Sequence, residues 1–387
     1  MPDKLVRIGI IGYGGMGSAH AGYLTKGEVP HANLAAICDH DPDRLRLARE
    51  KHGDTVQLFD NADALIASGA VDAIMVATPH YDHPPLCIKA LKAGLHALSE
   101  KPTGVYTRQV RELNEVADKT DRVFGVMFNQ RTRADHQKMR ELVQSGEIGE
   151  IKRTMYVITD WLRTQFYYDS GGWRGTWGGE GGGVLMNQAP HNLDLFQWIC
   201  GMPSRVRAFC KFGRYHNIEV EDDVTAYVEY PNGGSGIFIT ATGEAPGRNF
   251  LEITGDRGVI TMEKGNITFR RTTRSVQEHI NTCPKGFDRP ETWTIEIPGG
   301  GGEEHRGITK NWVNAIVHGT PLLAKGQEGI HGVELCNAML LSSWLDDWVN
   351  IPIDEDVYFD KLQEKIKTST FKKPDVQKRA MEFAGTF

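Results

Sequence analysis

The sequence predicts an α/β Rossmann domain followed by an α+β domain with a large, mostly antiparallel, open-faced sheet. Three observations carry this prediction. A short apolar run near the start of the chain leads into Gly12, Gly14 and Gly17; apolar runs then alternate with helical segments as far as residue 129; beyond it, strand-like runs follow one another across short turns. Alternation predicts parallel β-α-β units, and short turns predict antiparallel pairing. Because 387 residues exceed one core of ordinary size, two domains are expected.

The first strand is predicted over residues 7–11, and Gly12, Gly14 and Gly17 fall at the G-x-G-x-x-G positions that follow it. In a dinucleotide-binding motif, the first glycine allows the tight turn, the second lets backbone approach a pyrophosphate, and the third lets the helix pack closely on the strand. The free N–H groups of the following helix favour the phosphates. We expect this loop to supply five cofactor contacts: Gly12, Gly14, Gly15, Met16 and Gly17.

Asp39 ends the next apolar run, residues 34–38, and stands 22 positions after Gly17. This is close to the ~20 residues at which an acidic side chain takes the ribose hydroxyls of a dinucleotide. The alternative is a solvated Asp that merely ends a strand. A carboxylate here repels a 2′-phosphate, so NAD is favoured over NADP, although Arg44 lies nearby and keeps this preference moderate.

The other elements of the first domain, predicted over residues 1–129, follow in order. Asp41 is the expected N-cap of a helix with Pro42 at its first position. Further strands are expected over 71–77, 96–102 and 123–128, with a helix over 84–93. Ligands of such sheets gather beyond the C-terminal ends of the strands. The remaining expected cofactor contacts lie there or just after: Thr78, Pro79, His83, Glu100, Lys101 and Asn129.

In the second domain, predicted over residues 130–387, strands follow one another instead of alternating with helices. Strands are expected over 151–160, 205–212, 224–230, 236–241, 250–254 and 259–262, and helices over 308–318 and 328–350. The glycine run 299–302 is expected to be a flexible loop. A large sheet with one face free of helices is often an interface between subunits, so we expect a homo-oligomer, a dimer or a tetramer, through that face.

A Gly-rich, aromatic stretch over 173–183 leads into a segment that carries Asn187 and His191. On one helix, a spacing of four would place both side chains on the same face. Pro190 is tolerated only in the first turn of a helix, so Asn187 is expected in the entry turn. By spacing alone, a His191 that is simply hydrogen-bonded in the core is as good an interpretation as a functional one.

Glu100-Lys101-Pro102 after a late Rossmann strand, the Trp173-Arg174 pair and the Gly181–Asp194 segment occur in an order that resembles the Gfo/Idh/MocA oxidoreductases, the family of glucose–fructose oxidoreductase and inositol dehydrogenase. The resemblance covers nearly the whole chain. It implies that Lys101 reaches both cofactor and substrate hydroxyls and that His191 is the acid/base. The family commonly has Asp where this chain has Asn187. Asn cannot share a proton, so Asn187 is expected to position the substrate within the catalytic group Lys101, His191 and Asn187.

This group predicts hydride transfer between nicotinamide and a secondary alcohol of a sugar, glycoside or cyclic polyol. Neutral His191 would take the hydroxyl proton near pH 7, and cationic Lys101 would stabilise the developing alkoxide. Two alternatives stay open. The first is glycoside cleavage through transient oxidation with recycled NAD, and the second is a non-catalytic sensor of nucleotide or sugar. Retention of both Lys101 and His191 argues against the sensor.

Aromatic and amide side chains gather around the expected site, as suits a carbohydrate, although core packing accounts for part of them. Tyr167 belongs to this set, and arginines, Arg163 among them, could hold a carboxylate or phosphate. The expected substrate contacts are Lys101, Arg131, Trp161, Trp173, Arg174, Asn187 and His191.

Composition excludes several classes of function. A net charge of −6 argues against a nucleic-acid partner. No apolar run approaches the ~18 residues of a membrane span, and the start of the chain leaves no room for a signal peptide, so a cytoplasmic location is expected. Six scattered cysteines form no zinc or disulfide pattern, and His80 and His83 lie in a loop without further ligands. We therefore expect no metal.

Overall fold

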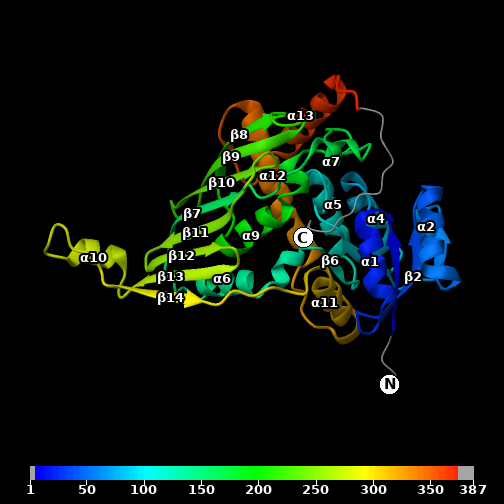
Figure 1. The fold of residues 1–387 in the computed structure, drawn as a ribbon, viewed down its shortest axis with the longest axis horizontal. Coiled ribbons are helices and arrows are strands. Elements are labelled where there is room, and N and C mark those ends of the chain that lie inside the picture. Colours follow the sequence, from blue (N-terminus) through cyan, green and yellow to red (C-terminus); the bar gives the residue numbers. More distant parts are fainter. Residues whose placement is uncertain (1–4, 374–387) are drawn as a thin grey trace.

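The computed structural model describes residues 5–373 and divides them between two sheets (Figure 1). The first sheet has six strands, all paired in parallel, in the order β3-β2-β1-β4-β5-β6. This confirms the predicted Rossmann arrangement, in which the direction of winding reverses between β1 and β4. Its strands are β1 (Val6–Ile11), β2 (Ala32–Cys38), β3 (Gln57–Phe59), β4 (Ala73–Val76), β5 (His96–Ser99) and β6 (Phe124–Val126).

Helices connect these strands and cover the sheet: α1 (Gly15–Thr25), α2 (Pro42–His52), α3 (Ala62–Ala67), α4 (His83–Lys92) and α5 (Thr107–Ala117). The predicted cap of α2 is confirmed, because the Asp41 carboxylate accepts a hydrogen bond from the Asp43 amide at 2.9 Å. The predicted strands agree with β1, β2, β4, β5 and β6 to within a few residues. The short elements β3 and α3, and the helix α5, were not predicted.

The second sheet has nine strands in the order β14-β13-β12-β11-β7-β10-β9-β8-β15. Every neighbouring pair is antiparallel except β7 and β10, so the predicted mostly antiparallel sheet is confirmed. Its strands are β7 (Ile151–Ile158), β8 (Arg205–Phe212), β9 (Glu221–Glu229), β10 (Ser235–Ala241), β11 (Asn249–Gly255), β12 (Gly258–Glu263), β13 (Asn266–Thr272), β14 (Thr292–Ile297) and β15 (Val349–Asn350). The sequence prediction missed β13, β14 and β15.

Helices pack on one face of this sheet and close its core: α6 (Ala134–Gln144), α9 (Pro190–Cys200) and α12 (Gly329–Leu345). On the other face, Phe209 and Tyr227 are exposed on neighbouring strands. The homo-oligomer expected through this face stays a prediction. The shorter helices are α7 (Gln165–Asp169), α8 (Val184–Asn187), α10 (Val276–Thr282) and α13 (Glu355–Thr368). None of the helices within residues 5–373 has the length and apolarity needed to cross a bilayer.

Two segments late in the sequence make long-range contacts: α11 packs into the first domain, and the glycine run 299–302 binds the start of α6. Helix α11 (Glu304–His318) places Ile308, Trp312 and Val313 in the core under β1 and β6, a contact that a division at residue 129 does not anticipate. The glycine run, expected to be flexible, instead supplies carbonyls of Gly300 and Gly301 that accept hydrogen bonds from the first amides of α6. The predicted helix over 328–350 ends at Leu345, where Asp346 turns the chain with φ = 54° into β15.

Candidate active site at the domain junction

The loop between β1 and α1 is shaped by two glycines that cannot carry a side chain. Gly12 has φ = +93°, and a Cβ there would lie 2.6 Å from the Ala77 carbonyl oxygen. A Cβ on Gly17 would lie 1.9 Å from the Gly12 carbonyl oxygen, so strand and helix are in direct backbone contact. The roles expected for the first and third glycines of the motif therefore have a steric basis in this loop.

The N-terminus of α1 is open for an anion. Gly14 is the N-cap, and no side chain caps the first amides of the helix. A Cβ on Gly14 would meet only the Arg44 guanidinium, at 3.8 Å, so the space in front of the loop is free. Uncapped N–H groups at the positive end of a helix dipole bind phosphate. The residues present thus fit the pyrophosphate of a dinucleotide.

Asp39 stands beside this loop. Its carboxylate accepts hydrogen bonds from the Tyr13 amide at 2.7 Å and the Asp41 amide at 2.9 Å, which fix its orientation at the end of β2. Arg44 donates to the Tyr13 carbonyl at 3.1 Å. Asp39, which disfavours the 2′-phosphate of NADP, and Arg44, which favours it, therefore flank the same loop.

The loop after β4 corrects one expected cofactor contact. His83 is buried, and its Nδ1 and Nε2 face the carbonyls of Pro102 and Thr78 at 2.7 and 2.8 Å. Both ring nitrogens face protein carbonyls and not a cofactor, and a neutral ring, with one N–H, donates to only one of the two carbonyls; His83 therefore joins two loops. The Thr78 hydroxyl, directly before Pro79 in the same loop, is by contrast buried without a partner among the described residues and stays a predicted contact.

Glu100 and Lys101 follow β5. Lys101 donates from Nζ to the Asn187 carbonyl at 2.8 Å, and burial lowers its pKa to about 8. Burial alone would raise the pKa of Glu100, but its 2.7 Å hydrogen bond and ion pair with His20 lower that pKa to about 2. Glu100 also accepts from the Lys101 amide at 3.1 Å. A fixed negative charge thus stands directly behind the lysine.

His191 lies in the first turn of α9, whose first residue is Pro190, and Asn187 ends α8 in the entry turn, as expected. The His191 Nδ1 is buried and has no partner among the described residues. Burial, followed by the charge of Lys101, holds the pKa of His191 well below its usual range, so the ring is neutral at pH 7. A ring nitrogen without a protein partner does not fit the interpretation of a histidine satisfied in the core.

A cavity of about 540 Å³ joins these groups. Seven of the predicted site residues line it: Met16, Lys101, Asn129, Trp161, Arg174, Asn187 and His191. The Asn129 side chain donates a 3.1 Å hydrogen bond to Glu304, which lies in the first turn of α11. The Trp161 indole donates to the Asn192 side chain at 3.0 Å. The structure therefore brings a cation of the first domain and an imidazole of the second to one space. Trp173 does not line it and packs against His80, with ring centroids 5.1 Å apart.

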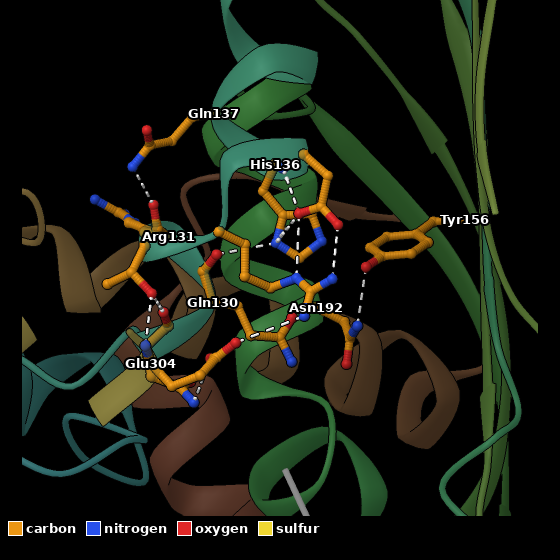
Figure 2. Close-up of polar contacts among 11 residues, drawn as sticks. Gln130, Arg131, His136, Gln137, Tyr156, Asn192 and Glu304 are labelled. Carbon is orange, nitrogen blue, oxygen red and sulfur yellow. Dashed lines mark hydrogen bonds and ion pairs between the residues drawn. The ribbon is translucent and has the colours of Figure 1, made fainter. Parts of the chain in front are cut away.

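Arg131 also departs from its expected role as a substrate contact. Its side chain is 1% exposed and lies in a buried network with α9 (Figure 2). The guanidinium donates to both carboxylate oxygens of Asp194, at 2.8 and 2.6 Å, to the Leu323 carbonyl at 3.1 Å, and to Glu328. All three nitrogens are therefore used within the protein, and Arg131 joins the segment after β6 to α9 and to residues 323 and 328 instead of facing substrate.

Sequence reasoning missed several residues that line the cavity and one buried carboxylate behind it, Glu180. Glu180, although not itself in the cavity wall, is buried and accepts hydrogen bonds from the Gly175 amide at 2.5 Å and from the Asn187 side chain. Burial raises the pKa of Glu180. Nothing local marks these residues, because they reach the cavity from turns and strand ends far apart in the sequence. The missed lining residues include Gln188 and four charged residues: Arg133, Arg248, Lys264 and Glu304.

One group of possible metal ligands occurs within residues 5–373, away from the cavity. His279, Cys283 and Asp288 place their ligand atoms within 4.8 Å of one another at the end of α10. The sequence expectation of no metal did not foresee this proximity. His279 and Cys283 are four residues apart, but Asp288 reaches them only through the following loop.

Comparison with known proteins gives a consistent result. Residues 6–128 match the model of the oxidoreductase family with an NAD-binding Rossmann fold, and residues 136–261 match the GFO/IDH/MocA C-terminal domain. D-glucoside 3-dehydrogenase of Escherichia coli is 30% identical over 60% of this chain and 69% of its own length. Inositol 2-dehydrogenase of Corynebacterium glutamicum is 34% identical over 38% of this chain and 44% of its own.

Among solved structures, the WlbA dehydrogenase of Chromobacterium violaceum, in complex with NADH and UDP-GlcNAcA, superposes with a TM-score of 0.78. It is 28% identical, and the match covers 92% of this chain and 98% of that one. The likeness therefore extends through both sheets and includes the junction between them.

Proposed function

Because the chain belongs to the Gfo/Idh/MocA oxidoreductases and carries their NAD-binding Rossmann domain, we propose that it oxidises or forms a secondary alcohol of a sugar, glycoside or cyclic polyol with NAD. The observation that carries this proposal is the meeting of Lys101 and His191 at one cavity. Relatives named glucoside and inositol dehydrogenases support the substrate class.

The residues around the loop fit NAD. Gly14, Gly15 and Met16 would hold the pyrophosphate, Asp39 the adenosine ribose, and Thr78 and Asn129 the nicotinamide side, where each has a buried oxygen without a partner. When bound, the nicotinamide accepts or supplies the hydride. The Asp39 carboxylate disfavours a 2′-phosphate, so we propose NAD over NADP.

The protein's own groups handle the proton. Neutral His191 accepts the proton of the substrate hydroxyl, and Lys101, held by the Asn187 carbonyl at 2.8 Å, stabilises negative charge on that oxygen. Glu100 and His20 keep this lysine in place from behind. Each role is typically worth ~10²-fold or more in rate.

The test is a panel of sugars, polyols and glycosides with NAD and with NADP, followed by absorbance of the reduced cofactor. Lys101→Met and His191→Ala should each lower kcat by ~10²-fold or more while leaving the Kd for NAD nearly unchanged. Lys92→Met removes a lysine from the far end of α4 and serves as the control. Equal turnover by wild type and either site variant refutes the assignment.

Two outcomes of the same panel separate the alternatives. Release of an aglycone from a glycoside without accumulation of NADH indicates oxidation-assisted cleavage with recycled cofactor. Binding of NAD and sugar without turnover by any substrate in the panel indicates a sensor.

A further inference from the structure

The cavity carries more positive charge than its own carboxylates neutralise. Arg133 pairs with Asp135 at 2.6 Å and with Glu304 at 3.5 Å, and Arg248 pairs with Glu263 at 2.7 Å. Two other arginines of the wall, Arg163 and Arg174, form no ion pair with any carboxylate of residues 5–373. Unpaired guanidinium groups in a concave wall are exceptional, because excluding water from them is costly unless an anion replaces it.

Both arginines stack on Tyr167, and each also lies over a tryptophan, Arg163 over Trp161 at 5.4 Å and Arg174 over Trp173 at 4.5 Å. The guanidinium carbons of Arg163 and Arg174 lie 5.2 and 4.3 Å from the centre of the Tyr167 ring. Arg174 donates to the Tyr167 hydroxyl, and Arg163 donates to the Leu162 carbonyl at 3.0 Å. The Arg163 Nε is buried without a partner. These stacking contacts hold both guanidinium groups at the cavity wall, and the Arg163 Nε still has no hydrogen-bond partner among residues 5–373.

Burial raises the pKa of the Glu180 carboxyl and the charge of Arg174 opposes that rise, but among residues 5–373 Glu180 is hydrogen-bonded to amides and forms no ion pair with Arg174. Glu180 receives the Gly175 amide and the Asn187 side-chain amide. Tyr167, which carries the arginines, also accepts from Asn187 and Gln188 at 3.1 Å each. The arginine pair is thus connected through one phenol oxygen to Asn187, the residue whose carbonyl holds Lys101.

We propose that Arg163 and Arg174 bind an anionic substituent, a carboxylate or a phosphate, on the same sugar whose hydroxyl lies at Lys101 and His191. The pair resting on Tyr167 is the specificity-determining element of the cavity. Guanidinium groups match the two oxygens of a carboxylate or phosphate with paired N–H donors. A neutral sugar would shield these cations from water without adding a counter-charge. This inference rests on the proposed function and narrows its substrate to sugar acids or sugar phosphates.

The test compares three probes that share one ring and differ at one carbon: D-glucose, D-glucuronate and D-glucose 6-phosphate. Binding of each to the NAD-loaded full chain is measured by calorimetry, and NADH formation is followed in parallel. One of the two anions should bind at least ~10-fold more tightly than glucose, and which anion does so identifies the substituent. Arg163→Gln and Arg174→Gln should each raise the Kd and KM of that anion ~10- to 100-fold with kcat within about threefold, and should change the Kd of glucose much less.

Arg122→Gln is the control, since Arg122 pairs with Asp121 at 2.7 Å before β6 and makes the same change in net charge. It should leave all three affinities unchanged. Equal affinity for glucose and both anions, failure of all three to bind, or an anion preference that survives both site substitutions overturns the inference. Anion binding that depends on both arginines but yields no NADH supports the anion site and refutes the proposed dehydrogenase.

Discussion

Arg131→Met should destabilise the fold strongly without acting through the substrate. The guanidinium makes two short hydrogen bonds to Asp194, and both side chains are 1% exposed. After the substitution, the Asp194 carboxylate keeps, within residues 5–373, only the hydrogen bond from the Gln197 side chain, at 3.0 Å. Removing one partner of a buried pair costs ~3–5 kcal/mol, because the other charge stays buried without compensation. We expect this loss in the free energy of unfolding, measured by urea titration.

The dependence of this loss on pH follows from Asp194. Burial raises the pKa of its carboxyl, and Arg131 opposes that rise. In the variant, the pKa therefore rises further above the unfolded value of 3.8. A folded-state pKa above the unfolded one contributes stability that is present at low pH and is lost as pH rises through the folded value. The deficit of Arg131→Met relative to wild type should thus be smallest near pH 4 and grow toward pH 8.

Two further variants make the result decisive. Arg131→Met combined with Asp194→Leu should be more stable than Arg131→Met alone, since an apolar pair buries no charge. Arg46→Met, which breaks the exposed pair with Glu50 at 3.0 Å, should cost ~0–1 kcal/mol. A pH-independent loss below ~1 kcal/mol for Arg131→Met would contradict the buried-pair reasoning. A raised KM with an unchanged free energy of unfolding would instead indicate that Arg131 contacts the substrate.

Three other predictions concern the cofactor and the lysine. Gly17→Ala should destabilise the protein by ~1–3 kcal/mol and weaken NAD binding, because its Cβ would lie 1.9 Å from the Gly12 carbonyl oxygen. The control is Gly22→Ala on the same helix, whose Cβ would meet no described atom within 4 Å and which should be neutral or stabilising by ~0.5–1 kcal/mol. Calorimetric unfolding with and without NAD measures both effects. Alcohol oxidation should fall as pH rises through about 8, where Lys101 loses its proton, and a kcat profile still rising through pH 9 would exclude an essential ammonium. Asp39→Ala should lower the ratio of kcat/KM for NAD over NADP by ~10-fold or more, as the repulsion of a 2′-phosphate is removed, and an unchanged ratio would remove Asp39 from cofactor choice.

Most of the Rossmann domain could be predicted because its signals are local. The glycine positions around Gly12, the cap at Asp41 and the apolar runs that became β1, β2 and β4 each depend on residues within one turn or one strand. The strands that were missed, β3 and β13 to β15, are short or lie toward the edges of their sheets. Strand β14 is exposed along nearly its whole length, so burial leaves little pattern in its sequence.

A site residue could be predicted where its position after a strand decides which way its side chain points. It could not be predicted where a partner distant in the sequence decides this. Lys101 follows directly on β5 and therefore faces the crevice at the end of the sheet. Arg131 also follows a strand of this sheet, β6, but Asp194, 63 residues later, turns its guanidinium toward α9. Glu304 reaches Asn129 only because α11 returns to the first domain. Such choices are made by tertiary contacts that a single sequence does not display.

The same contacts explain how Asn187 can serve where related proteins commonly have Asp. Its side-chain amide nitrogen donates to Glu180 and to Tyr167, so its oxygen is left to accept from a substrate hydroxyl at the cavity. An Asp at position 187 would face the buried Glu180 carboxylate, and two such carboxylates cannot both stay ionised at hydrogen-bond distance. In this chain the buried carboxylate bound to Asn187 is Glu180, and we expect Asn187 to position the substrate. Lys101, bound to the Asn187 carbonyl, senses this charge, since Glu180 raises the lysine pKa against the larger effect of burial.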